Sequence, residues 1–171
     1  MKAEHVWAAL DDARSGPLEE GSVGGGTGMI CYGFKGGSGT ASRLVEAAGG
    51  RWTVGAFVQK EPVDLVRLAR RATLGIGRSG TIGRHSSGDI FLAFTTANGA
   101  ALSESATKVI PVETLPEAEM NPLFEGAIQA IDEAILNALV ANRTMFGRDG
   151  HRVPALPAQA VLAMLRAAGR I

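Results

Sequence analysis

Apolar side chains recur at helical spacing in four stretches of the chain, residues 3–14, 62–72, 121–143 and 157–168. A spacing of three or four residues gathers such side chains on one face, so each stretch is predicted to form a helix. The pattern is most regular in the third stretch. The residues expected to face the core there are Phe124, Ile128, Ile131, Ile135 and Leu139.

Shorter apolar runs between glycine-containing turns predict the strands. These runs are residues 29–34, 40–46, 51–59, 74–83 and 89–96. The second and third flank Gly49-Gly50 and are predicted to form a hairpin, because paired glycines adopt tight turns readily. The fourth is rich in glycine and is expected to contain bulges, whereas the last, DIFLAFTT, is the strongest candidate for a buried strand. This order of elements predicts layered α/β or α+β packing around a mixed or antiparallel sheet.

Composition narrows the class of protein. The 171 residues, 46% of them hydrophobic, suffice for a single domain over residues 1–171. Seventeen basic and seventeen acidic side chains cancel, which argues against nucleic-acid and membrane-surface partners. No run of about 18 apolar residues could span a bilayer, and the charged N-terminus lacks a signal-peptide core. With Cys31 as the single cysteine, the expectation is a soluble, cytoplasmic protein without disulfides.

The glycine-rich segment GSVGGGTG, residues 21–28, cannot form a regular element. A phosphate-binding Walker loop would place Lys directly after its last glycine, yet Met29 follows Gly28 and Lys35 lies further on. A dinucleotide-binding loop would follow a strand, whereas this segment follows a predicted helix. Nucleotide binding is therefore disfavoured. The favoured interpretation is a tight loop packed against neighbouring backbone, and a nest of backbone amides for a carbonyl or oxyanion is the alternative.

Few side chains outside this loop suggest chemistry. The three histidines, His5, His85 and His151, are far apart and show no metal-ligand spacing, so no metal is expected. His5 is expected to face solvent, and Cys31 is expected to be a buried, inert thiol. The segment GRDGH, residues 147–151, is predicted to be a turn, because Asp-Gly is a frequent turn pair.

The segment HSSGDI, residues 85–90, is the most interesting of the remaining loops. It places a hydroxyl and a carboxylate two residues apart just before a predicted buried strand. Asp89 would be costly to bury without a partner, which suggests a functional role. A turn in which Asp89 or Ser87 bonds the nearby backbone explains the pattern equally well.

Three long segments of the chain resemble the DmpA-type aminopeptidases, the β-peptidyl aminopeptidase family. They are residues 4–59 (EHVW…AFVQ), 67–98 (RLARR…TTAN) and 142–157 (NRTMFGRDGHRVPALP). The motifs GGGTGM…GFKGG and SGDIFLAF carry the resemblance. It implies an αββα sandwich similar to the ornithine acetyltransferase fold, in which two sheets lie between helical layers.

The resemblance also implies a chemistry. Members of that family cleave themselves, and the serine exposed at the new N-terminus is the nucleophile, with its own α-amine as the general base. Their substrates are short peptides, amides or esters with a free amino terminus. The resemblance therefore implies a short peptide or amino-acid amide as ligand, no metal or organic cofactor, and a homo-oligomer.

The same resemblance assigns candidate site residues. Ser87 and Asp89 match a serine and an acidic residue that support the nucleophile, so Asp89 would hold an ammonium and Ser87 would orient a hydrogen bond. The glycine loop is expected near them as a substrate-contacting segment. Its assigned residues are Gly24, Gly25, Gly26 and Thr27.

The chain departs from the family pattern after VGAFVQ. Family members continue with Ala-Asn, whose asparagine serves the oxyanion site, but here Gln59 is followed by Lys60-Glu61-Pro62. Several tens of residues that include the Gly-Ser cleavage point have no counterpart, nor does the family's large N-terminal segment. We therefore expect an incomplete sandwich without self-cleavage or turnover. The alternative is a non-catalytic binding or assembly module derived from that family.

Overall fold

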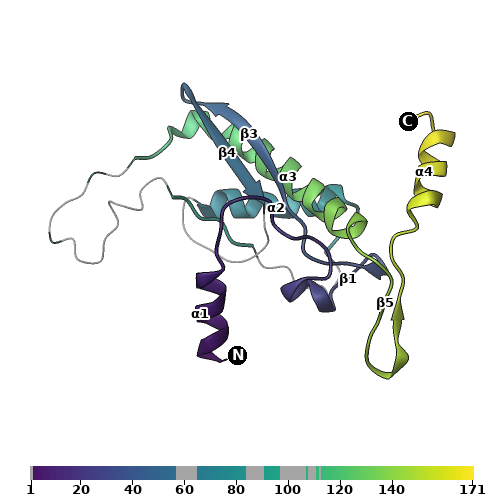
Figure 1. Ribbon diagram of the computed structural model, residues 1–171. Coiled ribbons are helices and arrows are strands. Elements are labelled where there is room, and N and C mark those ends of the chain that lie inside the picture. The colour runs from purple at the N-terminus through teal and green to yellow at the C-terminus, as the bar shows by residue number, and fades with distance from the viewer. Residues whose placement is uncertain (1, 57–64, 84–90, 97–106, 108–110, 112) are drawn as a thin grey trace.

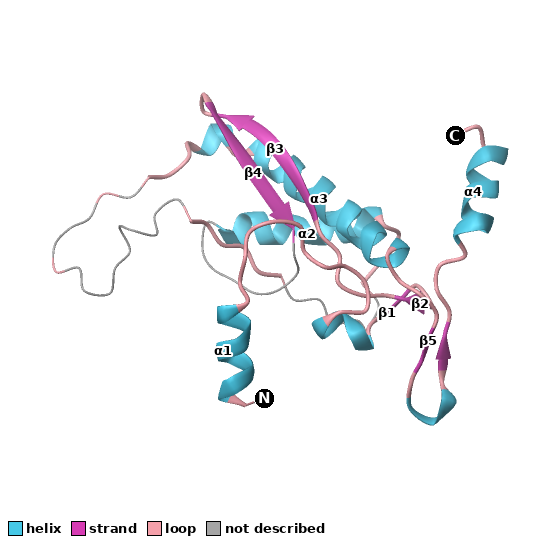
Figure 2. Ribbon diagram, viewed as in Figure 1, coloured by secondary structure: helices cyan, strands magenta, loops and turns pink. Residues whose placement is uncertain are grey.

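Helix α3, Asn121–Val140, forms the centre of the computed structural model, as Figure 1 shows. The structure describes residues 2–56, 65–83, 91–96, 107, 111 and 113–171. A hairpin of strands β3 (Ala41–Ala47) and β4 (Gly50–Ala56) packs on α3, and helix α2 (Leu65–Arg78) runs beside it. The body is thus a two-stranded antiparallel sheet backed by a helical layer (Figure 2).

The apolar stripe of α3 explains this arrangement. Of the predicted core residues, Phe124, Ile131 and Leu139 are buried, while Ile128 and Ile135 are half-buried. Small residues that the stripe did not single out complete the buried face. They are Gly126, Ala127, Ala130 and Ala134. Because these side chains are short, the hairpin and α2 can both approach the axis of α3 closely.

The described core contains two small clusters that link α3 to its neighbours. One joins Ala56 of β4 and Ala72 of α2 to Ala130, Ile131 and Ala134 of α3. The other joins Val45 and Ala47 of β3 to Leu123, with Leu68 of α2 packed against them. In both clusters residues of α3 pack together with residues of the hairpin and of α2, so α3 holds together elements that are distant in the sequence.

The predicted hairpin is confirmed, but its turn lies one residue earlier than predicted. The register pairs Ala41 with Ala56 and Ala47 with Gly50, which leaves Ala48-Gly49 as the loop. Both loop residues have positive φ, 49° and 72°, as a type I′ turn requires. This turn matches the right-handed twist of the strands, which explains why Ala48 tolerates a conformation that glycine would adopt more easily.

Helix α2 is longer than the sequence pattern predicted. The stretch 74–83 was expected to be a bulged strand, yet the helix continues to Arg78 with Gly75 and Gly77 inside it. Gly75 faces α3, where an added Cβ would stand 2.8 Å from both the Ile128 carbonyl oxygen and the Ile131 Cβ. Tertiary packing therefore outweighs the poor helix propensity of glycine at this position.

This contact yields a prediction with an internal control. We expect Gly75→Ala to destabilise the protein by about 1–3 kcal/mol, because the new methyl group would push α2 away from α3. Gly77 lies in the same helix with no atom within 4 Å of its Cβ position. Gly77→Ala should therefore stabilise the helix by about 0.5–1 kcal/mol. Urea unfolding followed by circular dichroism measures both, and shifts of the same sign would contradict the packing described.

Residues 29–34 do not form the predicted single buried strand. They form a small hairpin of β1 (Ile30–Cys31) and β2 (Phe34–Lys35) instead. Tyr32 and Gly33 between them have φ of 53° and 79°, so the chain reverses where a continuous strand was expected. Ile30 is consequently 53% exposed.

The strongest strand candidate, residues 89–96, is also not confirmed. Residues 89 and 90 lie outside the described part, and residues 91–96 contain no strand. Phe91 packs against the cluster around Ala130, but Phe94 is 74% exposed. A strand needs a neighbour to pair with its backbone, and no described strand pairs with this segment.

Both termini carry the helices that the sequence predicted, α1 (Ala3–Asp11) and α4 (Ala158–Ala167). Neither has a buried residue, and Figure 1 shows both extending away from α3 and the hairpin. Strands β5 (Met145–Phe146) and β6 (Arg152–Val153) form a further hairpin. Its connection includes a 3₁₀ turn at Arg148–Gly150, which confirms the predicted GRDGH turn. Among the described helices, none has the length and apolarity to cross a membrane.

Candidate functional site

The glycine-rich loop is built around a buried lysine. The loop contains a short 3₁₀ helix, Gly24–Gly28, and Lys35 of β2 lies under it with only 2% of its surface exposed. The Lys35 Nζ donates hydrogen bonds to the carbonyl oxygens of Gly26 at 3.0 Å and Met29 at 3.1 Å, and to that of Gly36. One side chain thus joins the loop, β1 and β2 into a single unit.

Burial makes Lys35 electrostatically unusual. Desolvation lowers the pKa of its ammonium below the ordinary lysine value, because a charged group loses its hydration there. Within the described residues no carboxylate forms an ion pair with it, so backbone carbonyl dipoles alone solvate the charge. This lysine is enclosed by its carbonyl partners. It cannot reach a phosphate without leaving them, which agrees with the sequence argument against nucleotide binding.

The interior of the loop confirms the close-packing interpretation. Gly26 is buried, and a Cβ at this position would collide with the backbone of Ser38 and Gly21. The amides of Val23 and Gly26 already donate to the carbonyls of Gly21 and Val23, both at 2.9 Å. These two amides are therefore not available to an oxyanion. The other residues assigned as substrate-contacting, Gly24, Gly25 and Thr27, lie exposed on the outer edge of the loop.

Side-chain hydrogen bonds attach the loop to the end of α3. The Ser22 hydroxyl donates to the Asn142 Oδ1 at 2.7 Å. The Glu20 Oε1 accepts from both the amide and the hydroxyl of Thr40, each at 2.8 Å. The Thr40 carbonyl in turn accepts from the Asn137 Nδ2 at 2.8 Å. The loop is thereby fixed to the helix that also holds the hairpin.

A backbone bond attaches the C-terminal segment as well. The amide of Lys35 donates to the carbonyl of Pro154 at 2.7 Å, so the residues after β6 lie against the same unit. The loop that was expected to contact substrate is thus held by the end of α3 and by the segment that follows β6.

Ser87 and Asp89, the residues assigned to catalysis, lie outside the described residues, as does His85. The chain on either side of them borders a shallow hollow beside α2. Its lining residues are Thr73, Ile76, Gly77, Thr81, Ile82, Gly83 and Phe91. Because Gly83 and Phe91 flank residues 84–90, this hollow is the described surface nearest in sequence to the assigned pair. Whether the pair approaches the glycine loop stays a prediction.

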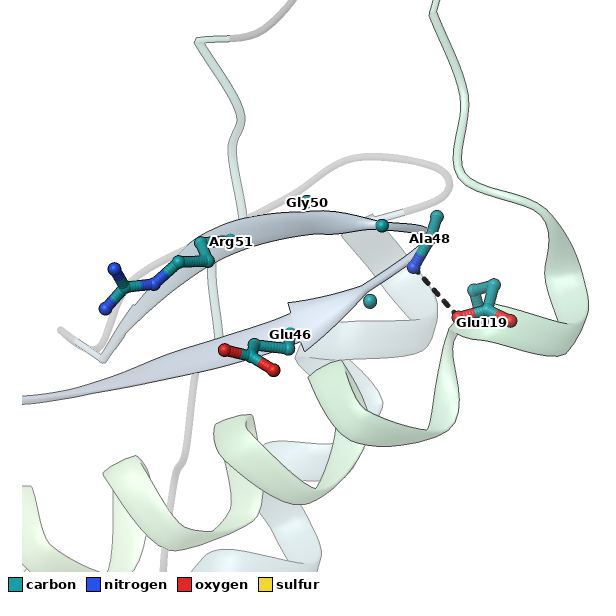
Figure 3. A pocket seen from close by; sticks show the side chains of 7 residues that line it. Glu46, Ala48, Gly50, Arg51 and Glu119 are labelled. Carbon is teal, nitrogen blue, oxygen red and sulfur yellow. Dashed lines mark hydrogen bonds between the residues drawn. The ribbon is translucent and has the colours of Figure 1, made fainter.

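A second hollow lies at the turn of the hairpin, where Figure 3 shows Glu46, Arg51 and Glu119 around it. Glu119 comes from the 3₁₀ turn Glu117–Glu119, and its Oε2 accepts a hydrogen bond from the Ala48 amide at 2.9 Å (Figure 3). Its lining side chains include no hydroxyl or thiol, so it offers no nucleophile of the serine or cysteine type. The hydrogen bond of Glu119 fastens the hairpin turn to the segment that leads into α3.

The remaining candidates behave largely as expected. His5 is exposed, as predicted, and its Nδ1 accepts a bond from the Lys2 amide at 3.3 Å. Cys31 is half-buried, less buried than predicted, because β1 lies near the surface. Across the described residues, no group of His, Cys, Asp and Glu side chains is arranged to hold a metal ion.

Comparison with known proteins gives a consistent result. The model for peptidase family S58 matches residues 1–64 and, in a second piece, residues 60–153. The beta-peptidyl aminopeptidase BapA of Sphingosinicella microcystinivorans is 37% identical over 97% of this chain and 56% of its own length. The enzyme of the same name from Sphingosinicella xenopeptidilytica is 35% identical over 98% of this chain and 55% of its own length. The chain therefore spans about half the length of these relatives.

The alignment also locates an internal gap. The alignment with the first relative covers 223 residues, although this chain has only 171. Several tens of positions of that relative therefore face no residue inside this chain. The family match breaks at residues 60–64, which places the gap between β4 and α2.

Solved structures agree with the described backbone. A protein of Pyrococcus horikoshii OT3 matches with a TM-score of 0.89 and 36% identity over 98% of this chain and 57% of its own. The L-aminopeptidase D-Ala-esterase/amidase of Ochrobactrum anthropi is described as a prototype of the serine aminopeptidases. It matches with a TM-score of 0.85 and 35% identity over 96% of this chain and 57% of its own. A β-aminopeptidase of Burkholderia sp. matches with a TM-score of 0.82 and 38% identity over 99% of this chain and 60% of its own.

These structures define the class of fold. The Ochrobactrum enzyme is a variant of the Ntn-hydrolase fold, and the described helices and hairpin follow that fold. This agrees with the incomplete αββα sandwich that the resemblance implied. The chain belongs to peptidase family S58.

Sequence reasoning missed the residues that organise the loop. Lys35 entered the argument as a lysine displaced from a Walker position and as part of the motif GFKGG, and Glu20, Ser22 and Asn142 were given no role. A lysine followed by two glycines after a short apolar run was the available signal. Its meaning depends on three backbone carbonyls that leave no trace in the sequence.

Proposed function

We propose that this chain is an S58-family protein related to aminopeptidases acting on short peptides, amides or esters with a free amino terminus, and that alone it neither cleaves itself nor turns substrate over. The observation that carries the proposal is the internal gap after residue 60. By resemblance, the cleavage point and its serine nucleophile belong to that gap. A covalent mechanism without its nucleophile has no route to the acyl-enzyme.

The residues that could retain a role are Ser87 and Asp89. In this proposal the Asp89 carboxylate binds the ammonium of a peptide N-terminus, and the Ser87 hydroxyl orients a hydrogen bond beside it. The exposed edge of the glycine loop, Gly24, Gly25 and Thr27, borders the same site. Binding of an amino-terminal group could then persist where cleavage does not.

The first test is the mass of the purified protein after prolonged incubation. We expect one intact species near the 17.7 kDa given by composition, because self-cleavage requires a serine set against the preceding carbonyl and donors for the oxyanion. Incubation in 6 M urea, where no active site can persist, provides the baseline for chemical breakdown. Two stoichiometric fragments, the second beginning at a serine, would show that the nucleophile has been assigned to the wrong segment.

A second candidate function is assembly. It is favoured by a specific observation, the absence of buried residues in α1 and α4 together with an open face on the hairpin. A chain that leaves so much apolar surface uncovered is suited to bind another polypeptide.

A further inference from the structure

The hairpin β3–β4 has one covered face and one open face. Val45 and Ala47 point toward α3 and are buried. The alternate residues of both strands point the other way, and all of them are exposed. They are Ser42, Leu44 and Glu46 on β3, and Arg51, Thr53 and Gly55 on β4. Leu44 lies in the middle of this open face and is 57% exposed.

Among the described strands, none pairs with either outer edge of the hairpin. The two-residue turn makes Ala47 and Gly50 a hydrogen-bonded pair, and such pairs alternate along an antiparallel ladder. Leu44 and Glu46 on β3, and Thr53 and Gly55 on β4, therefore direct their amides and carbonyls outward. In the described part of the chain none of these four amides donates to an acceptor.

A two-stranded sheet with an open face and open edges is unusual in native proteins. A two-stranded hairpin with an open face is marginally stable in water, and natural proteins cover or block strand edges. The outward residues here include no proline, and the open face carries one acidic and one basic side chain, Glu46 and Arg51. Leu44 is the one large apolar side chain on this face, and it is 57% exposed.

The comparisons indicate what should cover this surface. The described backbone agrees with solved structures at TM-scores of 0.82 to 0.89, although those chains are much longer. The hairpin therefore keeps the geometry that it has in a larger fold. The segment that this chain lacks internally would continue directly from the end of β4, one of the two strands of the hairpin, before the chain enters α2.

We propose that hairpin β3–β4 is a docking surface for a second polypeptide that supplies the family segment missing after residue 60. That polypeptide would pair an extended strand with one outer edge of the hairpin and place apolar side chains over Leu44. Backbone hydrogen bonds would provide affinity, and apolar contacts with Leu44 would provide selectivity. The proposal goes beyond the function proposed above, since docking does not require turnover.

The test uses a synthetic peptide with the sequence of the Sphingosinicella microcystinivorans relative that faces the gap, titrated into the full chain by calorimetry. We expect saturable binding with one peptide per chain. Leu44→Lys should weaken binding by about tenfold or more, because it places a charge in the centre of the docking face. Leu18→Lys is the matched control, because Leu18 is 56% exposed and lies outside the hairpin, and binding should stay within about twofold.

Hydrogen exchange identifies the paired edge. The peptide should slow exchange at the amides of Leu44 and Glu46 or at those of Thr53 and Gly55, but not at both edges. A scrambled peptide that binds equally well, or the absence of binding, would overturn the proposal. So would sedimentation showing that a second copy of this chain already covers the face, with Leu44→Lys dissociating it. None of these outcomes depends on whether the chain cleaves itself, so they separate this proposal from the proposed function.

Discussion

Hydrolysis of an aminoacyl p-nitroanilide by this chain is expected to proceed at the background rate. Loss of the nucleophile from a covalent hydrolase typically lowers the rate by roughly 10⁴–10⁶. In the proposed function, the family segment that supplies the nucleophile belongs to the internal gap after residue 60. The measurement is release of p-nitroaniline with time at several protein concentrations, because true turnover scales with protein and breakdown of the substrate does not.

Two variants make the result interpretable. Ser87→Ala should leave the rate unchanged, since the background does not pass through this hydroxyl. Asp89→Asn should weaken binding of an aminoacyl amide measured by calorimetry, again without changing the rate, because the ammonium loses its counter-charge. Robust wild-type turnover that Ser87→Ala abolishes would mean that another serine performs the chemistry, and the proposed loss of function would be wrong.

Replacing the buried lysine should have the largest effect on stability. We expect Lys35→Met to lower the free energy of unfolding by roughly 2–4 kcal/mol. Methionine fills a similar volume but donates nothing to the carbonyls of Gly26, Met29 and Gly36. The loss is moderated because Gly26 and Met29 also accept backbone bonds from the amides of Met29 and Gly36. Urea unfolding followed by circular dichroism measures the change.

The pH dependence of the same variant provides a second measurement. Because burial lowers the pKa of Lys35 in the folded state, the unfolded chain holds its proton to higher pH. Wild-type stability should therefore gain an increment as pH rises from the lowered pKa to the ordinary lysine pKa, and Lys35→Met should lack it. Below that window both states are protonated and the increment is absent.

An exposed lysine provides the control for these measurements. Lys2 forms only a surface ion pair with Glu4, so Lys2→Met should change stability by less than about 0.5 kcal/mol. Unfolding of Lys35→Met that is indistinguishable from Lys2→Met would show that the carbonyls around Lys35 do not depend on its ammonium.

The parts of the fold predicted correctly from the sequence are those determined by local pattern. The stripe through Phe124, Ile131 and Leu139 gave α3, because a helix with one apolar face has few other ways to bury it. The hairpin was predictable because glycine marked its turn, although the loop is Ala48-Gly49 rather than Gly49-Gly50. The terminal helices followed from the same reasoning.

The errors occur where contacts between distant segments decide the structure. Glycines at positions 75 and 77 suggested a bulged strand, but Gly75 is there because α2 must approach the backbone at Ile128. Residues 29–34 were predicted to form one strand because most of them are apolar, and this composition does not reveal the turn at Tyr32-Gly33. The glycine loop was correctly expected to pack tightly. Its central lysine was not foreseen, because lysine is almost always a surface residue and its partners here are backbone atoms.

The central position of α3 explains how the fold can withstand an internal deletion. The hairpin and α2 each pack on α3, so their placement does not depend on the length of the chain that joins Ala56 to Leu65. The entropic cost of closing a loop changes by only about 0.6 kcal/mol for each doubling of its length. Shortening that connection by several tens of residues therefore changes the chain entropy of folding very little. What the shorter connection removes is apolar contact area, at about 25 cal/mol for each Å² that stays in water. In the docking proposal, a second polypeptide would restore that contact without rejoining the backbone.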